Sequence, residues 1–372
     1  MPRIIVALLL ACLVPAPAQA APSLERMIGQ MIVVGFDGSR PLSLNVLRTR
    51  REIAQGRIGG VMLLGRNVSD ETGTRSLIAA LKGAAREQPL IVAVDQEGGR
   101  VARLKGHMGV TRLPSAARVA AGHDPNGAAR LYEKSGRDLA RWGFNLNFGP
   151  VVDVNTNPAN PIIGRLGRAF SDRPEHVARY ARAFVRGHRR AGVLTALKHF
   201  PGHGSSRDDS HHGTSDITRT WDAAELVPFA NLVATGDADV VMTGHLLHRG
   251  FAKRPATLSR RIVTGLLRER LGFRGVVVAD DLQMGAIRRL HSEEEASVAA
   301  IRAGVDLLLF SRDREIDPGL VGRVTRAVAV AARGDPRLRR RIRESHRRIV
   351  RLKARLGVPG RAPQASASAT AG

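Results

Sequence analysis

The chain has 372 residues, of which 43% are hydrophobic and 24% charged, a composition typical of globular enzymes that excludes disordered and collagen-like classes. Its formal charge is +25, from 58 basic and 33 acidic residues, and the arginines are spread along the chain. Because only 4% of residues are aromatic and no nucleic-acid-binding module is recognisable, the charge favours association with an anionic cell envelope over nucleic acid as a partner.

Residues 1–20 have the pattern of an export signal. Arg3 precedes an apolar run over residues 4–14, and small residues then permit cleavage after Ala20. Cys12 is the only cysteine, and lipidation there is a less favoured alternative to soluble export. We therefore expect a periplasmic or extracellular protein whose mature chain forms no disulfide.

Short apolar runs alternate with amphipathic stretches over residues 21–357, a pattern that predicts parallel strands with helical crossovers. The eight runs cover residues 30–36, 58–64, 89–95, 144–154, 193–199, 238–245, 275–280 and 304–310. Eight such units predict an α/β fold, a single-domain (β/α)8 TIM barrel. A doubly wound open sheet is the alternative, but no Gly-x-Gly-x-x-Gly motif follows the first run.

Charged residues stand at the ends of several runs, and these ends form the active face of a barrel. The third run ends at Asp95 and leads through Glu97 and a glycine pair to Arg103. These acids and arginines are equally suited to hydrogen-bonding sugar hydroxyls and to forming a structural ion pair with one another. After the fourth run a polar loop presents Arg168, which alone is equally compatible with a solvated side chain.

The densest cluster begins at the end of the fifth run. It places a lysine, three histidines and a carboxylate within fourteen residues: Lys198, His199, His203, Asp209 and His211. A Pro-Gly break inside the cluster excludes a helical pair of zinc ligands. We expect Lys198 and His199 to be fixed at a strand end, with Asp209 and His211 on a loop that swings in when substrate arrives.

The seventh run ends in two adjacent aspartates, Asp280 and Asp281. Carboxylates after an apolar strand are unfavourable unless they are paired or used in a reaction. Because neighbouring residues of a strand face opposite ways, only one of the two can point at a central substrate.

The C-terminal region predicts a helix followed by a tail. Apolar residues recur at helical spacing among many arginines, which indicates a docked helix with a solvated basic face: Leu338, Ile342, Ile349, Leu352 and Leu356. Residues 358–372 are rich in Pro, Ala and Ser and are expected to be disordered.

Four segments together resemble glycoside hydrolase family 3, and more closely its single-domain β-N-acetylhexosaminidase branch: Asp95 to Arg103, Lys198 to Gly204, Asp209 to His211 and Asp280 to Met284. The resemblance implies a retaining exo-β-N-acetylglucosaminidase in which Asp280 forms a covalent glycosyl-aspartate. It further implies that Asp209 and His211 act together as the acid/base. No cofactor or metal is expected.

The resemblance also assigns five residues to the hydroxyl and acetamido groups of the terminal sugar: Asp95, Arg103, Arg168, Lys198 and His199. Arg168 lies in a loop whose length varies within the family. The implied substrate is a glycan or muropeptide that contains N-acetylglucosamine, and a monomer is expected. Relatives of this type are often cytoplasmic, so the export signal instead favours action on wall fragments outside the inner membrane.

Three alternatives are weighed against this function. A β-glucosidase or xylosidase of the same family would differ only in substrate. A metal-dependent barrel hydrolase would use His199, His203, Asp209 and His211 as ligands, but the first run offers none. A non-catalytic sugar-binding barrel is disfavoured because the nucleophile and acid/base positions are both occupied.

Overall fold

The computed structural model describes residues 22–210, 213–311 and 316–359. The predicted signal segment 1–20 with Cys12, the predicted acid/base His211 and nearly all of the tail 358–372 lie outside the described residues. None of the helices in the described part of the chain is both long enough and apolar enough to cross a bilayer.

Eight parallel strands form a barrel, and each falls on one of the eight predicted runs, with only β7 extending one residue past the end of its run. The strands are β1 Ile32–Val34, β2 Gly60–Leu63, β3 Ile91–Val94, β6 Leu146–Asn147, β7 Leu194–Phe200, β9 Val240–Thr243, β11 Val276–Ala279 and β12 Leu308–Phe310. They pair in the order β11-β9-β7-β6-β3-β2-β1-β12, and a parallel bridge between Val278 and Leu307 joins the two ends. The barrel prediction is confirmed, and the open sheet is excluded.

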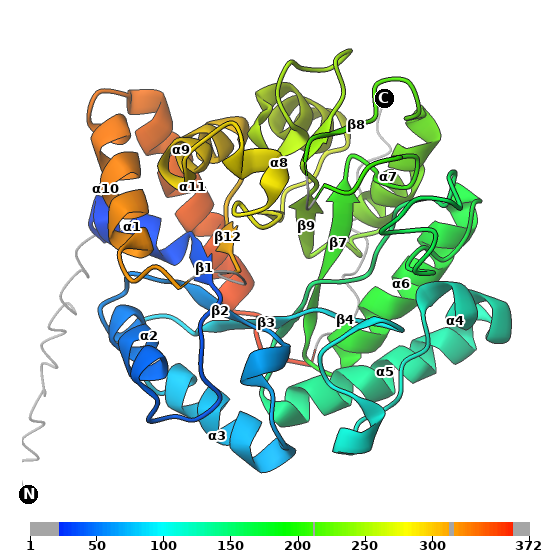
Figure 1. Ribbon diagram of the computed structural model, residues 1–372, viewed down its shortest axis with the longest axis horizontal. Coiled ribbons are helices and arrows are strands. Elements are labelled where there is room, and N and C mark those ends of the chain that lie inside the picture. The colour runs from blue at the N-terminus through cyan, green and yellow to red at the C-terminus, as the bar shows by residue number, and fades with distance from the viewer. Residues whose placement is uncertain (1–21, 211–212, 312–315, 360–372) are drawn as a thin grey trace, which may run out of the picture.

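Helices surround the strands as an outer ring, seen approximately along the barrel in Figure 1. The crossover helices are α2 Leu44–Ala54, α3 Glu71–Lys82, α5 Pro125–Trp142, α6 Pro174–Arg190, α7 Val227–Ala234, the π-helix η5 Arg261–Arg270, α9 Glu293–Ala303 and α10 Leu320–Arg333. The remaining helices are α1 Leu24–Gln30, α4 Ala116–Gly122, α8 Gly285–Arg288 and α11 Pro336–Lys353, with 3₁₀ turns η1 Gly65–Asn67, η2 Gly106–Met108, η3 Ala223–Leu226 and η4 Ala256–Leu258.

Local sequence signals set the ends of these elements, as α9 illustrates. Ser292 Oγ accepts a hydrogen bond from the Glu295 amide at 3.2 Å, and the Glu295 carboxylate accepts one from the Ser292 amide at 3.1 Å. The helix ends at Gly304, whose φ of 119° is disfavoured for any residue with a Cβ atom. The chain can therefore turn directly from α9 into β12.

A buried ion cluster holds the C-terminal helix against the closing seam of the barrel. Asp306, immediately before β12, accepts hydrogen bonds from Arg268 Nη2 at 2.6 Å, the Val277 amide at 2.9 Å and Ser345 Oγ at 2.8 Å. Arg341 of α11 also pairs with Asp306. The apolar face of α11 is buried, so the predicted docked helix is confirmed.

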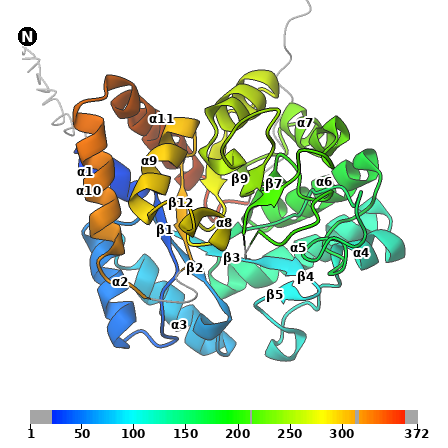
Figure 2. The same cartoon turned by 45° about the horizontal axis from the view of Figure 1, so that its top comes forward.

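Two short strand pairs lie outside the barrel sheet. Strands β4 Gln96–Gly98 and β5 Val101–Ala102 form an antiparallel hairpin, and β8 Ser215–Asp216 pairs in parallel with β10 Leu246–Leu247. Figure 2 shows the β4–β5 hairpin on the side of α4 and α5, opposite α9 and α10. The hairpin follows β3 directly, so it forms part of the wall around the barrel mouth.

Candidate active site

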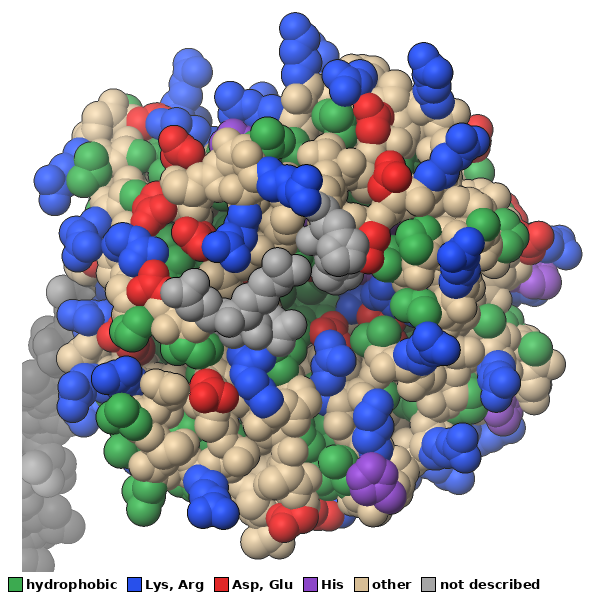
Figure 3. Space-filling view, viewed as in Figure 1, with side chains coloured by type: hydrophobic (Ala, Val, Ile, Leu, Met, Phe, Trp, Pro, Cys, Tyr) green, Lys and Arg blue, Asp and Glu red, His purple; other side chains and the backbone are tan. Residues whose placement is uncertain are grey.

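The carboxyl ends of the barrel strands border a cavity of about 540 Å³, where this fold places its active sites. Apolar side chains from several strands line part of it: Met62, Phe148, Met242 and Leu309. Charged side chains line the rest, a combination typical of small-molecule sites. Figure 3 shows a hollow near the centre of this face, with acidic and basic side chains at its edge.

Lys198 is the centre of a buried charge cluster in the wall formed by β3 and β7. Its Nζ lies 2.9 Å from Asp95 Oδ1 and 2.6 Å from Glu97 Oε1. Asp95 also accepts a hydrogen bond from Arg103 Nη2 at 3.3 Å, and Glu97 accepts two from Arg168 at 2.8 Å each. Two carboxylates thus pair with three cations, which leaves one net positive charge, and all five side chains line the cavity.

In this cluster, the neighbouring opposite charges shift the pKa values of Glu97 and Lys198 more than burial does. Burial alone raises the pKa of Glu97, but Arg168 and Lys198 hold that pKa well below its ordinary range. Burial alone lowers the pKa of Lys198, but the carboxylates of Asp95 and Glu97 raise it above its ordinary value. Glu97 and Lys198 are therefore ionised at neutral pH and present fixed charges to a ligand in the cavity.

Arg168 reaches the cavity while most of its guanidinium group is held by the protein. Its Nε and Nη2 donate to the two carboxylate oxygens of Glu97, and its Nη1 donates to the Ile162 carbonyl at 2.9 Å. Such bidentate pairing fixes the plane of the guanidinium group. Arg168 is thus held in a buried ion pair with Glu97 rather than solvated, and the structural ion pair that the sequence left open for the Asp95–Arg103 segment is present between those two residues.

Lys198 and His199 both line the cavity although they are neighbours on β7. In a regular strand adjacent side chains point to opposite faces. The pairing of β7 with β9 shifts register between Leu197 and Phe200, which is the irregularity that lets both side chains reach one cavity.

Asp153, a fully buried carboxylate in the segment that follows β6, fixes the orientation of His199. Its Oδ2 lies 2.8 Å from His199 Nδ1, and its Oδ1 accepts hydrogen bonds from the amides of His199 at 3.0 Å and His203 at 2.9 Å. Burial raises the pKa of Asp153, but the interaction with His199 brings it below its ordinary value. An ionised carboxylate only accepts, so Nδ1 of His199 carries a proton and Nε2 is left for a ligand.

His203 supports the segment that leads to the predicted acid/base. Its Nδ1 lies 2.6 Å from Ser206 Oγ and its Nε2 lies 3.1 Å from Ser210 Oγ. Burial lowers the pKa of His203 to about 4, so the ring is neutral at physiological pH. Ser210 lines the cavity and follows directly on Asp209, which is half-buried. His203 therefore orders this segment next to the cavity.

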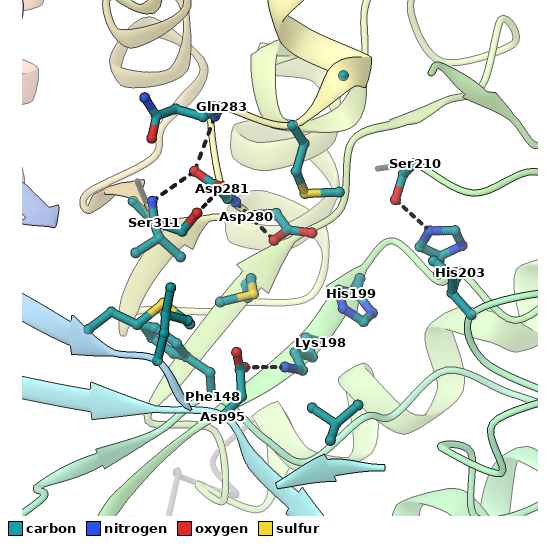
Figure 4. A pocket seen from close by; sticks show the side chains of 18 of the residues that line it. Asp95, Phe148, Lys198, His199, His203, Ser210, Asp280, Asp281, Gln283 and Ser311 are labelled. Atoms are coloured by element: carbon teal, nitrogen blue, oxygen red, sulfur yellow. Dashed lines mark hydrogen bonds and ion pairs between the residues drawn. The ribbon is translucent and has the colours of Figure 1, made fainter. Parts of the chain in front are cut away.

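Asp280 and Asp281 follow β11 and have different surroundings, as Figure 4 shows. The Asp281 carboxylate is turned toward Ser311, from whose amide and hydroxyl it accepts hydrogen bonds at 3.0 Å and 2.5 Å. Burial raises the pKa of Asp281. Asp280 accepts a hydrogen bond from the Asp281 amide at 2.9 Å and faces the open cavity. Of the two aspartates, Asp280 is thus the one presented to a substrate.

The ligand set of the metal-dependent alternative is not assembled in the described part of the chain. Both ring nitrogens of His203 are engaged by serine hydroxyls, and Nδ1 of His199 is engaged by Asp153. Within residues 22–210, 213–311 and 316–359, no group of three His, Cys, Asp or Glu side chains is placed to hold a metal ion.

Glu225, which the sequence reasoning missed, lies beneath the turn that follows β7. It is fully buried, and its Oε2 accepts a hydrogen bond from the Gly204 amide at 3.0 Å. Burial raises its pKa to about 7. No motif marks this glutamate, which comes from the distant turn η3 and is brought under the segment by the fold.

Replacing Glu225 by Gln is expected to stabilise the protein at alkaline pH and to leave it nearly unchanged at acid pH. The unfolded chain ionises this carboxyl near its ordinary value of 4.5, whereas the folded protein retains the proton until about pH 7. Stability therefore falls as pH rises between these values, by on the order of 3 kcal/mol. Urea unfolding at pH 4.5 and pH 8 measures this difference.

The exposed Glu269 provides a matched control for this substitution. Glu269→Gln removes the same charge without changing a buried group, and we expect it to alter unfolding by less than about 0.5 kcal/mol at either pH. A Glu225→Gln variant that is no more stable than the parent protein at pH 8 would show that the fold does not raise the pKa of Glu225.

Comparison with known proteins agrees with this geometry. Residues 23–352 match the family model described as the glycosyl hydrolase family 3 N terminal domain. Beta-hexosaminidase A of Pseudoalteromonas piscicida is 35% identical over 327 residues, which cover 79% of this chain and 54% of that protein.

Two solved structures share the fold. A glycoside hydrolase family 3 beta-N-acetylglucosaminidase from Paenibacillus sp. str. FPU-7 has a TM-score of 0.83 and 35% identity, covering 94% of this chain and 65% of that one. The beta-N-acetylhexosaminidase from Beutenbergia cavernae has a TM-score of 0.82 and 34% identity, covering 90% of this chain and 99% of that one. The chain thus spans 54% and 65% of the first two relatives and nearly the whole of the third.

Proposed function

Because the chain belongs to glycosyl hydrolase family 3, we propose that it is a retaining exo-β-N-acetylglucosaminidase, which removes terminal β-linked N-acetylglucosamine from peptidoglycan fragments. The observation that carries this proposal is the position of Asp280, which faces a cavity whose opposite wall holds Asp95, Lys198 and His199. The relatives named beta-hexosaminidase and beta-N-acetylglucosaminidase support the choice of sugar.

In the first step, the Asp280 carboxylate attacks the anomeric carbon while the bond from that carbon to the leaving oxygen breaks. His211, oriented by Asp209, gives its proton to the leaving oxygen. The product of this step is a covalent glycosyl-aspartate together with the free leaving group. The fixed cations of the cavity wall stabilise the charge that develops near the sugar ring.

In the second step, water attacks the same carbon and releases the sugar. His211 is now neutral, takes a proton from the water and returns to its starting state, and the Asp280 carboxylate is regenerated. A neutral histidine adds no negative charge beside the nucleophile, which suits a site with one aspartate facing the cavity. Two inversions at the anomeric carbon give overall retention.

The sugar is held by side chains of the buried cluster. Asp95 accepts hydrogen bonds from sugar hydroxyls, while Arg103, Lys198 and the free Nε2 of His199 contact hydroxyl or acetamido groups. Arg168 contributes its remaining N–H groups and keeps Glu97 in place. The predicted export signal supports the proposal that the substrate is a wall fragment outside the inner membrane.

The experiment that tests the function compares an aryl N-acetyl-β-glucosaminide with the matching aryl β-glucoside. We expect kcat/KM to be at least about 100-fold higher for the acetamido sugar, because a site built to hydrogen-bond a polar group discriminates strongly against its absence. Proton NMR of the fresh product is expected to show the β-anomer first. A preference for the glucoside would contradict the choice of sugar and favour a β-glucosidase, and an initial α-anomer would contradict the covalent mechanism.

A further inference from the structure

A second concave surface lies on the other side of the β4–β5 hairpin from the active-site cavity. We call it the basic groove; its volume is about 860 Å³. Its lining combines residues of the hairpin, the 3₁₀ turn η2 and the segment leading into α4: Gly99, Arg100, Ala102, Leu104, Lys105, Gly106, His107, Val110, Arg112, Leu113, Pro114, Ser115 and Arg118, with Leu166.

The hairpin is a shared wall between the groove and the active-site cavity. Val101 and Arg103 line the cavity, whereas Arg100 and Ala102 line the groove, as the alternation of side chains along a strand requires. Leu166 lines both spaces and is partly exposed. The groove therefore meets the cavity at Leu166, and one extended ligand can occupy both.

The groove is lined by cations without any carboxylate. Arg100, Lys105, Arg112 and Arg118 line it together with His107, and no Asp or Glu is among its lining residues in the described part of the chain. All five side chains are exposed. Within the described residues, no hydrogen bond or ion pair engages these cationic groups, in contrast to the paired arginines of the neighbouring cavity wall.

Concavity and composition distinguish this surface from the other basic regions. Most arginines of α11 lie on the exposed outside of the helix, where water screens them well, and the two that are partly buried, Arg341 and Arg348, pair with Asp306. A concave surface of one sign concentrates its field on a bound group. The groove also contains the apolar residues Leu104, Val110 and Leu113, so it suits a ligand with both carboxylates and aliphatic parts. Figure 3 shows basic side chains below and to the right of the central hollow.

We propose that the basic groove is a subsite for the leaving part of the substrate and binds the carboxylates of an acidic peptide attached to it. This inference rests on the proposed glycosidase function. An exo-acting enzyme encloses one terminal sugar, so the rest of the substrate must leave the cavity across its edge. Leu166 lies on that edge between the two spaces, and the groove beyond it offers charges opposite to those of such a peptide.

The test neutralises three groove cations that take no part in the cavity wall, in the variant Lys105→Gln, Arg112→Gln, Arg118→Gln. Its substrates are a β-N-acetylglucosaminide whose leaving sugar carries an acidic tetrapeptide, the same compound with amidated carboxylates, and an aryl N-acetyl-β-glucosaminide. Since each exposed ion pair contributes only a little to binding and three are removed together, we expect kcat/KM for the acidic compound to fall about tenfold. The other two substrates are expected to change by less than about twofold.

A matched control removes three charges from a remote surface, in the variant Arg339→Gln, Arg340→Gln, Arg343→Gln on α11. We expect this variant to turn over all three substrates at rates within about twofold of the parent protein, because field effects at that distance are screened. In the parent protein, the preference for the acidic over the amidated compound should shrink as salt is raised from 50 to 500 mM.

Each other outcome overturns the inference. Equal losses in the two triple variants would indicate general attraction by net charge rather than a groove site. A groove variant that keeps the preference for the acidic compound but loses retention on a heparin column would indicate a polyanionic polymer as the occupant. If the groove variant hydrolyses the aryl compound and shows no selective loss of kcat/KM on the acidic compound, the groove proposal alone is contradicted. If the parent protein is inactive on all three N-acetylglucosaminides, the proposed function is contradicted as well.

Discussion

Replacing Asp280 by Asn is expected to lower kcat for an aryl N-acetyl-β-glucosaminide by at least about 10⁴-fold, the scale associated with loss of a catalytic nucleophile. Asparagine keeps the shape of the side chain and an oxygen for the Asp281 amide, which donates to Asp280 at 2.9 Å. It lacks the negative charge needed to attack the anomeric carbon. Steady-state kinetics measure the loss, and calorimetry with N-acetylglucosamine is expected to give a Kd within about threefold of that of the parent protein.

Asp281 provides the matched control because it is adjacent, also borders the cavity and carries the same charge. Its carboxylate is turned toward Ser311 and burial raises its pKa, so burial reduces the cost of replacing it with a neutral side chain. We expect Asp281→Asn to retain kcat within about tenfold. Equal losses in the two variants would contradict a nucleophilic role that is specific to Asp280, as would an Asp280→Asn variant with more than about 1% of the parent kcat.

The sequence predicted the barrel strands because each is a short apolar run buried on both faces, such as the Val-Val-Val-Ala of β11. Their exact ends were less predictable. The fourth run extends over residues 144–154, yet only Leu146–Asn147 forms a strand there. The rest of that run is held by irregular backbone hydrogen bonds to β3 and β7, such as Phe148 N–H to the Val94 carbonyl at 2.9 Å, and by the buried Asp153, which no periodicity marks. Local pattern thus predicts which segments enter the barrel, and tertiary contacts decide where each strand ends.

For the candidate site too, the local sequence pattern predicted some residues, and tertiary contacts determined the residues it missed. The rule that polar residues after parallel strands gather at one end of a barrel predicts Asp95, Lys198 and Asp280. That rule gives no pairing partners, so it did not show that Glu97 lies between Lys198 and Arg168. It also could not find Glu225, which reaches the Gly204 amide from outside the strand ends. The choice of partner depends on loop packing, which only the folded chain determines.

Glu97→Gln is expected to be the most destabilising single change in the cavity wall. The side chain of Glu97 is only 6% exposed and pairs with both Arg168 and Lys198. Its loss leaves Arg168 without a carboxylate partner at this position, and breaking a buried pair in this way costs about 3–5 kcal/mol. We also expect kcat/KM to fall at least about tenfold, because Lys198 and Arg168 lose their fixed positions. Urea unfolding and steady-state kinetics measure the two effects.

The effect of this substitution on stability should depend on pH in a defined direction. The interactions with Arg168 and Lys198 hold the pKa of Glu97 well below its ordinary range in the fold. The stabilisation is therefore complete well above the ordinary value of 4.5 that applies in the unfolded chain, and it is lost progressively as the pH falls below that value. We expect the difference between parent and variant to be constant from pH 6 to 8 and smaller at pH 3.5. A difference that is unchanged at pH 3.5 would contradict the ion pair as its cause.

A second substitution separates the structural part of this cluster from its contacts with the sugar. In the double variant Glu97→Gln, Arg168→Met, the unpaired guanidinium group is gone, so part of the lost stability should return, by about 1–3 kcal/mol relative to Glu97→Gln. If Arg168 also contacts the sugar, kcat/KM should stay low despite the recovered stability. Recovery of both quantities would show that Arg168 serves only to hold Glu97, and that Asp95, Lys198 and His199 bind the sugar without it.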